Sequence, residues 1–407
     1  MIGAFRHPFR RRPRAGTLAP RRSRWPWLAA CLLAFLRIGQ GQAADPPWLG
    51  RLELPPGFAI RVFAEVPDAR SLAVADGGAR IYVGTRGTDV FAVLDPERDG
   101  VANEVVKVAD GLNVPNGVAV AGDGALLVVE QSRLLQIEPS GATEEIMPAG
   151  VLPDDVFHGW RYARFGPDGL LYIAVGAPCN VCEIRGFEGT ILRMRADGHD
   201  LQIFARGIRN SVGFDWHPRT KELFFTDNGG DFLGDLIPPD ELNRAPEPDL
   251  HFGYPYQYGQ AVPYPDFAGR DPPQPTTPPG LEFEAHVAAL GIEFYDGDML
   301  PAGYRGDAFV AQHGSWNRTD PVGYRVMRIR FDELGRPVGK EEFIAGWLRS
   351  DGGVLGRPVD ITELPDGSLL ISDDHAGLIY RVIHSGRDTP VAGQQPIPAG
   401  ASRDRSR

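Results

Sequence analysis

A histidine and an arginine stand directly before one of the strand-like runs of this chain, in a pattern that could serve proton transfer or anion binding. His158 and Arg161 lie in FHGWR, just ahead of LLYIAV, a run typical of a buried strand. An imidazole titrates near neutral pH and can accept a proton there, and a guanidinium binds anions. The two residues could equally form a satisfied structural corner. The remainder of the chain decides between these interpretations.

Further polar groups stand beside other strand-like runs. If those strands belong to equivalent units of a repeated fold, polar residues at matching positions converge in space. Their recurrence at matching positions then favours a shared functional site over separate polar residues at the surface. The groups are Arg209 and Asn210 in GIRNSVGFDW, residues 227–231 in DNGGD, Gln312, His313, Trp316, Asn317 and Arg318 in QHGSWNR, and Arg357 and Asp360 in GRPVD.

Units consisting of a turn and a strand recur six times, and their spacing predicts the fold. Their centres are 45, 45, 52, 85 and 61 residues apart. Repeats of about 40–50 residues made of short strands are typical of propeller blades. The six centres are Ile81, Leu126, Leu171, Leu223, Ala308 and Leu369.

We therefore predict an all-β fold, a six-bladed β-propeller of four-stranded antiparallel blades over residues 48–385. No long stretch has the period of an amphipathic helix. The wide spacing after the fourth centre predicts an insertion around residues 236–290, rich in Pro, Tyr and Asp. Residues 386–407 are expected to form a disordered C-terminal tail.

The first 43 residues have the layout of a signal peptide. Arginines precede the apolar run from Trp25 to Leu36, and small residues suited to cleavage follow, up to Ala43. A basic region, an apolar region and small residues in this order indicate export. We therefore expect a periplasmic or secreted protein, with an uncleaved membrane anchor as the alternative.

The charge of the mature chain argues against one class of partner. Residues 1–43 contain nine arginines and no acidic residue, so their removal changes the formal charge from −11 to −20. Such a body repels the phosphates of nucleic acid, and we expect no nucleic-acid partner. It leaves many carboxylates that could bind a divalent cation.

Two cysteines remain once Cys31 is removed with the signal peptide. Cys179 and Cys182 are spaced C-x-x-C in GAPCNVC. In an oxidising compartment such a pair is read as a local disulfide. A structural zinc site would need two further ligands, and redox catalysis is less favoured because no thioredoxin-like pattern surrounds the pair.

Five motifs in order resemble one enzyme family. They are FHGWRYARFGPDGLLYIAVGAPCNVCE, FARGIRNSVGFDWHP, DELN followed by HFGYPYQYG, FVAQHGSWNR, and GRPVDITELPDGSLLISDDHAGLIYRV. Together they are similar to the soluble sugar dehydrogenases that use pyrroloquinoline quinone (PQQ), above all the sorbosone dehydrogenase-like branch. The resemblance covers roughly residues 50–385. It implies a six-bladed propeller with PQQ and Ca²⁺ at the mouth of its axis.

The resemblance also implies roles for individual residues. His158 matches the catalytic base, which takes the hydroxyl proton of the substrate as hydride leaves for the quinone. Arg209 matches the arginine that contacts the quinone and stabilises its growing negative charge, and Asn210 would position it. Both Arg209 and Asn210 therefore count as cofactor-binding.

The remaining expected ligands fall into two groups. Gly229 and Gly230 match backbone carbonyls that hold Ca²⁺, and Asp240 matches an acidic position near the metal. Arg357 matches an arginine that pairs with carboxylates of PQQ. Trp316 and Arg318 lie where the family has a cofactor-binding lysine, and Arg318 is the replacement cation.

Three positions depart from the glucose-oxidising relatives. Ala177 stands where they keep an aspartate, Phe157 where they have an acid, and Val359 where they have a second arginine. These changes leave open what orients His158. The nearby acids 154 and 155 are the candidates, and Arg161 could either brace an acid or touch the cofactor or substrate.

The sequence thus predicts an exported quinoprotein that oxidises an aldose or a sorbosone-like sugar aldehyde. Glu183 follows Cys182, so no haem-attachment motif C-x-x-C-H is formed and electrons must pass to a separate acceptor, a quinone or a cytochrome. The alternatives are a Ca²⁺-dependent propeller lactonase or hydrolase, and a non-catalytic propeller that binds sugars or proteins. The oligomeric state stays open.

Overall fold

The structure is a computed structural model that describes residues 45–138 and 140–386. The signal peptide predicted over 1–43 lies outside the described residues, as does the predicted tail except for its first residue. Within the described part of the chain, the only helical elements are four 3-10 turns. These are η1 (Leu49–Arg51), η2 (Asp76–Gly78), η3 (Pro265–Phe267) and η4 (Ala302–Tyr304).

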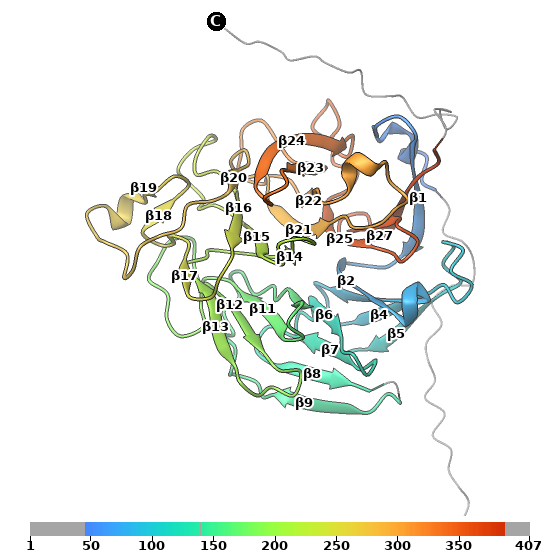
Figure 1. Cartoon of the computed structure of the whole chain (residues 1–407), viewed down its shortest axis with the longest axis horizontal. Coiled ribbons are helices and arrows are strands. Elements are labelled where there is room, and N and C mark those ends of the chain that lie inside the picture. The colour runs from blue at the N-terminus through green and yellow to red at the C-terminus, as the bar shows by residue number, and fades with distance from the viewer. Residues whose placement is uncertain (1–44, 139, 387–407) are drawn as a thin grey trace, which may run out of the picture. The chain divides into compact units, whose positions relative to one another are not determined.

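Six antiparallel sheets surround a central axis as the blades of a β-propeller (Figure 1). The first comprises β2 (Ala69–Ala75), β3 (Arg80–Thr85), β4 (Val90–Leu94) and β5 (Glu104–Ala109). The second comprises β6 (Gly117–Val120), β7 (Leu126–Val129), β8 (Leu134–Ile137) and β9 (Thr143–Met147). The third comprises β10 (Ala163–Phe165), β11 (Leu171–Val175), β12 (Thr190–Met194) and β13 (Gln202–Arg206).

The other three blades follow the same order, with two exceptions at their outer edges. The fourth comprises β14 (Phe214–Trp216), β15 (Leu223–Asp227), β16 (Glu241–Ala245) and β20 (Leu281–Glu282). The fifth comprises β21 (Ala289–Phe294), β22 (Ala308–Gln312), β23 (Arg325–Phe331) and β24 (Pro337–Ile344). The sixth comprises β25 (Pro358–Glu363), β26 (Leu369–Asp373), β27 (Leu378–His384) and β1 (Phe58–Glu65).

These sheets confirm the predicted six-bladed propeller. Each of the six centres read from the sequence lies in the second strand of its blade, from Ile81 in β3 to Leu369 in β26. Around the axis, the first strands of neighbouring blades pack closely together, except that β10 of the third blade and β14 of the fourth do not. The sixth blade takes its outer strand from the start of the chain, because β1 pairs with β27.

Apolar side chains on both faces of each blade form the core between neighbouring blades. Phe224 and Phe225 on β15 illustrate this, since successive side chains of a strand point to opposite faces. Phe225 packs with the third blade and Phe224 with the fifth, and both are fully buried. The burial of such rings is the main stabilising contribution to a blade contact.

The extra chain of the fourth blade lies between β16 and β20. It contains β17 (Leu250–His251), which pairs with β13 and so adds a parallel fifth strand to the otherwise antiparallel third sheet, and the hairpin of β18 (Gln257–Tyr258) and β19 (Val262–Pro263). This segment is shorter than the predicted range of 236–290, because β16 and β20 are themselves strands of the fourth sheet.

Loops that enter first strands and loops that join second to third strands meet at the same end of the axis.

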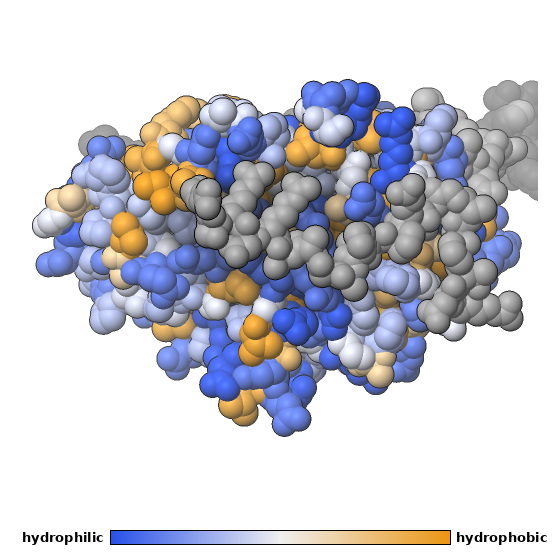
Figure 2. All heavy atoms as spheres, turned by 90° about the horizontal axis from the view of Figure 1, so that it is seen from above, coloured by the Kyte–Doolittle hydropathy of each residue, from blue (hydrophilic) through white to orange (hydrophobic). Residues whose placement is uncertain are grey.

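Among the described residues, no helix is long and apolar enough to cross a membrane. Hydrophilic residues cover most of the face shown in Figure 2, where apolar residues form separate patches.

Candidate active site

A cavity of about 250 Å³ opens where these loops converge. Six of the predicted site residues line it, whereas Gly230, Arg318 and Arg357 do not. The six are His158, Arg209, Asn210, Gly229, Asp240 and Trp316. The wall also contains residues that the sequence did not single out as ligands, among them Arg70, Arg86, Asn228, Asp231, His286, His313, Asn317 and Asp374.

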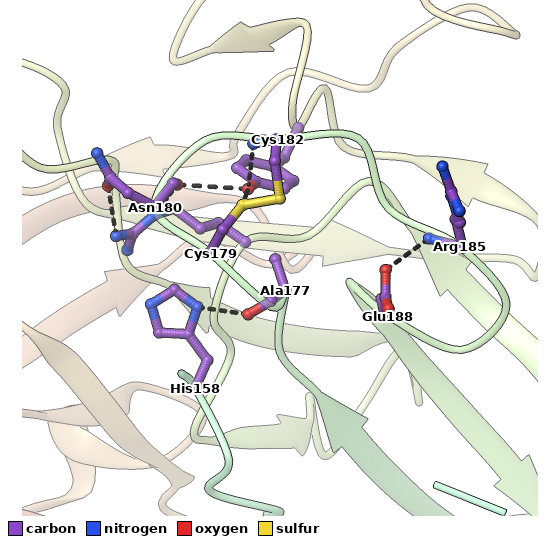
Figure 3. The surroundings of a disulfide bond; sticks show 9 residues. His158, Ala177, Cys179, Asn180, Cys182, Arg185 and Glu188 are labelled. Atoms are coloured by element: carbon purple, nitrogen blue, oxygen red, sulfur yellow. Dashed lines mark hydrogen bonds between the residues drawn. A yellow bond between two sulfur atoms is a disulfide. The ribbon is translucent and has the colours of Figure 1, made fainter. Parts of the chain in front are cut away.

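The ring of His158 is held by a backbone carbonyl. Its Nδ1 lies 2.8 Å from the oxygen of Ala177 (Figure 3). Since a carbonyl can only accept, Nδ1 carries the proton and Nε2 keeps its lone pair. Neither candidate acid, Asp154 or Asp155, contacts the ring. The carbonyl of Ala177, the residue that replaces the family's aspartate, takes the orienting role that the sequence left open.

The backbone around His158 is tightly constrained. His158 itself has a φ of +50°, a left-handed conformation that is uncommon for a histidine. A Cβ added at Gly176 would lie 2.4 Å from the Cβ of His158 and 2.8 Å from its carbonyl oxygen. Gly176 therefore allows the two loops to approach closely enough for the bond to Ala177.

The surroundings keep His158 neutral. Burial is the main cause that lowers its pKa to about 3, and the positive charges of Arg209 and Arg161 lower it further. The bond to Ala177 acts in the opposite direction but is weaker. His158 is therefore a proton acceptor over the whole physiological range, although a weak one in the ligand-free protein.

Arg161 braces the loop that carries His158 and does not line the cavity. Its guanidinium is buried and donates to three carbonyl oxygens. These belong to Gln131 at 3.0 Å, His158 at 2.9 Å and Pro153 at 2.7 Å. Burial lowers the pKa of Arg161 to about 10, which still leaves it a cation. Of the two alternatives left open for Arg161, contact with a ligand at the cavity is not seen, and its hydrogen-bond partners are carbonyls rather than an acid, although the charge of Asp155 is near enough to raise its pKa.

Arg209 lines the cavity, but four of its five N–H groups are already used. Nε donates to the Asn180 carbonyl at 2.9 Å, and Nη1 to the Asn228 carbonyl at 3.1 Å. Nη2 donates to Oδ1 of Asn180 at 2.9 Å and to the carboxylate of Asp231 at 2.8 Å. Within residues 45–138 and 140–386, one Nη1 proton has no partner, and this proton is available to a ligand.

Asp227, at the end of β15, fixes the backbone of the same loop. Its carboxylate accepts from the backbone N–H of Arg209 at 2.9 Å and of Asn210 at 2.6 Å. Burial raises the pKa of Asp227 to about 7. The bonds set the direction in which residues 209 and 210 leave the turn.

Three amide oxygens at the cavity are buried without a hydrogen-bond partner among the described residues. They are the Oδ1 atoms of Asn210, Asn228 and Asn317. The orientation of two of them is fixed by their amide nitrogens, since Asn228 donates to the Asn210 carbonyl and Asn317 to Asp231. Buried polar atoms are normally paired, so these oxygens indicate a ligand with donors or a cation.

The expected metal ligands are only partly accessible. Both carboxylate oxygens of Asp240 accept backbone N–H groups, from Gly229 at 2.8 Å and Ala288 at 2.7 Å. Burial raises the pKa of Asp240 to about 6. Gly230 packs against Tyr264, whose hydroxyl accepts its N–H at 3.1 Å. In the described part of the chain, no group of three His, Cys, Asp or Glu side chains could hold a metal ion.

The opposite wall presents a cluster of which the sequence analysis singled out only His313. Asp374 accepts from Nε2 of His313 at 2.8 Å and from Nη1 of Arg70 at 2.8 Å, and Arg86 lies 3.9 Å away. Burial alone would raise the pKa of Asp374, but His313 and the two arginines hold it well below its usual range. The guanidinium of Arg70 lies over the ring of Trp160 at 4.4 Å.

Two of the arginines expected to bind cofactor, Arg318 and Arg357, do not line the cavity. Arg357 contacts Nδ1 of His313 at 3.4 Å and the hydroxyl of Tyr324 at 3.2 Å. Arg318 donates to the carbonyl of Ala285 at 3.1 Å. The positive charge that lines this side of the cavity is therefore that of Arg70 and Arg86. Arg86 could have been found from the sequence, because it follows the second strand of its blade, as Ala177 does in the third. Arg70 lies inside β2 and carried no such signal.

The two cysteines close the loop after β11. Cys179 and Cys182 form a disulfide with a Cα–Cα distance of 6.1 Å (Figure 3). Asn180, between them, contacts Arg209 through its carbonyl and its side chain, and Asp231 through its side chain. The loop therefore belongs to the wall of the site.

One family model and one curated relative match this chain. A model described as TrAA12-like matches residues 242–385. An uncharacterized protein of Borreliella burgdorferi is 33% identical over 354 residues, which cover 82% of this chain and 91% of that protein.

Solved structures share the fold. The holo PQQ domain of pyranose dehydrogenase from Coprinopsis cinerea superposes with a TM-score of 0.68 at 18% identity, covering 85% of this chain and 98% of that one. A calcium structure of a Trichoderma reesei protein of the carbohydrate-active enzyme family AA12 gives 0.67 at 18% identity, with 86% and 99% covered.

Proposed function

This chain belongs to the PQQ sugar dehydrogenase-like family, and from that premise we propose that it is an oxidoreductase that oxidises an aldose or a sorbosone-like sugar aldehyde. One observation carries the proposal. His158 is held neutral at the cavity wall, with Nδ1 fixed on a carbonyl and Nε2 unprotonated, beside the guanidinium of Arg209.

His158 and Arg209 have different roles in the proposed reaction. Nε2 of His158 accepts the proton of the hydroxyl on the carbon that loses hydride, which is the anomeric hydroxyl of an aldose or a hydroxyl of a hydrated aldehyde. The Ala177 carbonyl keeps the ring in place. The positive charge of Arg209 stabilises negative charge that develops near its remaining N–H. When bound, PQQ supplies a quinone that accepts hydride from the substrate carbon.

The donors of the cavity suit a ligand with several carboxylates. Arg70 and Arg86 supply cations on one wall and Arg209 on the other. Planar guanidinium groups match carboxylate geometry. Arg70 and Arg86, rather than Arg318 and Arg357, are the residues that would hold the carboxylates of PQQ in this chain.

Ca²⁺ is the second expected cofactor. Both oxygens of the Asp240 carboxylate already accept backbone N–H groups, so further, neutral oxygens would have to complete the coordination of the ion. The unpartnered Oδ1 atoms of Asn210 and Asn228, next to Gly229, are oxygen donors of the kind that this hard cation prefers.

Export to the periplasm or the medium, and transfer of electrons to a separate quinone or cytochrome, complete the proposal. The basic and apolar layout of residues 1–43 and the cysteine pair support export. The lack of a C-x-x-C-H motif in the sequence supports a separate acceptor.

Reconstitution tests the function. Purified protein is titrated with PQQ and Ca²⁺, and dye reduction is followed with a panel of aldoses and aldehydes. His158→Ala and Arg209→Ala are compared at saturating PQQ. His158→Ala should keep PQQ affinity and lower kcat by about 10²–10⁴, whereas Arg209→Ala should weaken both binding and turnover. Lactone hydrolysis without PQQ, or a wild-type rate in His158→Ala, would refute the proposal.

A further inference from the structure

We propose that Asn180, in the loop closed by the Cys179–Cys182 disulfide, is the positioning residue that sets the guanidinium of Arg209 and the carboxylate of Asp231 for ligand binding. This inference rests on the proposed function, because the ligand concerned is PQQ. On this proposal, the GAPCNVC loop positions residues of the site and is not chiefly needed for the stability of the blade.

Asn180 bonds to both members of an ion pair. Its carbonyl accepts from Nε of Arg209 at 2.9 Å, and its Oδ1 accepts from Nη2 of the same arginine at 2.9 Å. Oδ1 also accepts from the backbone N–H of Asp231 at 2.7 Å, and Nδ2 donates to the Asp231 carbonyl at 3.0 Å. The ion pair itself is 2.8 Å long.

This set of contacts requires an asparagine. A side chain must accept from Arg209 and from the backbone N–H of residue 231, and must also donate to the carbonyl of residue 231. An amide does all three. A carboxylate of the same size could accept but not donate, and would add a negative charge next to Asp231. An alanine would leave only the backbone contact.

Asn180 acts from behind the wall. Arg209 and Asp231 line the cavity, whereas Asn180 does not. Asp231 is held on its other oxygen by Nδ2 of Asn317 at 2.6 Å. With Asn180 in place, the guanidinium of Arg209 is fixed in its plane by bonds to Nε, Nη1 and Nη2, and its one unused N–H has a defined direction.

The disulfide and Tyr254 hold Asn180 at this point. The Tyr254 hydroxyl, from the insertion, accepts from the N–H of Cys182 at 3.1 Å and donates to the Asn180 carbonyl at 3.3 Å. A disulfide between residues three apart closes a very short loop and constrains the unfolded chain little. Its effect is therefore expected on the local path of the loop.

Three variants test the proposal: Asn180→Ala, Asn180→Asp, and the double variant Cys179→Ser/Cys182→Ser. The control is Asn103→Ala, whose side chain is exposed between β4 and β5. PQQ affinity is measured by calorimetric titration, folding by thermal melting, and turnover as kcat and KM at saturating PQQ.

Asn180→Ala should raise the Kd for PQQ by about 10- to 100-fold, since hydrogen bonds to a charged group are lost. Asn180→Asp, which keeps the acceptor contacts, should lie between Asn180→Ala and the wild type. The serine variant should melt close to the wild type yet bind PQQ several-fold more weakly. The control should match the wild type in every measurement.

The outcomes are separable. If the wild type does not bind PQQ, the proposed function fails. If the wild type binds and Asn180→Ala has an affinity within twofold of it, the positioning role is overturned. Should Asn180→Ala not fold, the serine variant decides: a folded serine variant with wild-type affinity overturns the proposal, and a folded one with weakened affinity supports it.

Discussion

Gly176→Ala should disable the site without touching a catalytic atom. The added Cβ would lie 2.4 Å from the Cβ of His158, where ordinary carbon contacts are about 3.5–4.0 Å. The histidine must therefore move by about 1 Å. It cannot simply slide along its loop, because its carbonyl oxygen lies 2.8 Å from the same Cβ and accepts from Arg161.

A misplacement of about 1 Å in a reacting group can lower turnover by about 10²-fold. Overpacking of this size typically destabilises a protein by about 1–3 kcal/mol, which a propeller of this length should withstand. We therefore expect Gly176→Ala to remain folded, with kcat at saturating PQQ reduced by about two orders of magnitude.

The assay compares dye-linked kcat and melting temperature with those of Gly122→Ala. Gly122 is exposed, and an added Cβ there would meet no atom within 4 Å. It controls for the loss of a glycine. If Gly176→Ala and Gly122→Ala turn over sugar equally fast, the close approach of residues 158 and 176 does not position the base, and the reasoning is refuted.

Three further outcomes are expected. In the ligand-free protein, His158 should titrate near pH 3, well below the ordinary value of about 6.5. An NMR titration should show a higher pKa for His158 in Arg209→Gln, because that variant removes one of the positive charges that lower it. An ordinary pKa in the wild type would contradict this prediction. Arg161→Met should lower the free energy of unfolding, measured by chemical denaturation, by about 3 kcal/mol or more, because three carbonyls lose their donor. The control Arg195→Met, at an exposed ion pair, should lower it by under about 1 kcal/mol. Equal losses in the two variants would argue against a bracing role for Arg161. Chelation should abolish dye reduction and Ca²⁺ with PQQ should restore it, so full activity of a metal-free preparation would exclude the metal.

The fold could be read from the sequence because its signal is local and repeated. Each blade contributes a turn and a short apolar run, and the second strands recur at Ile81, Leu126 and onward to Leu369. Such a pattern needs no knowledge of distant contacts. The same regularity placed His158, Arg209 and Asn210 at equivalent strand ends, and these three do line one cavity.

The orientation of side chains within the loops could not be read this way. His158 is oriented by the backbone carbonyl of Ala177. Every residue type has this carbonyl, so the amino-acid sequence does not reveal the contact. Arg357 carries the matching motif yet lies behind His313, while Arg70 and Arg86 from the first blade supply the charge at the wall.

The sequence by itself therefore determined the repeated blade, the residue types gathered at its strand ends and the spacing of the two cysteines. Only the tertiary structure decided which side chains reach the cavity. Asn180 meets Arg209 across 29 residues and Asp231 across 51. Contacts of that range depend on the path of several loops at once, and no local pattern encodes them.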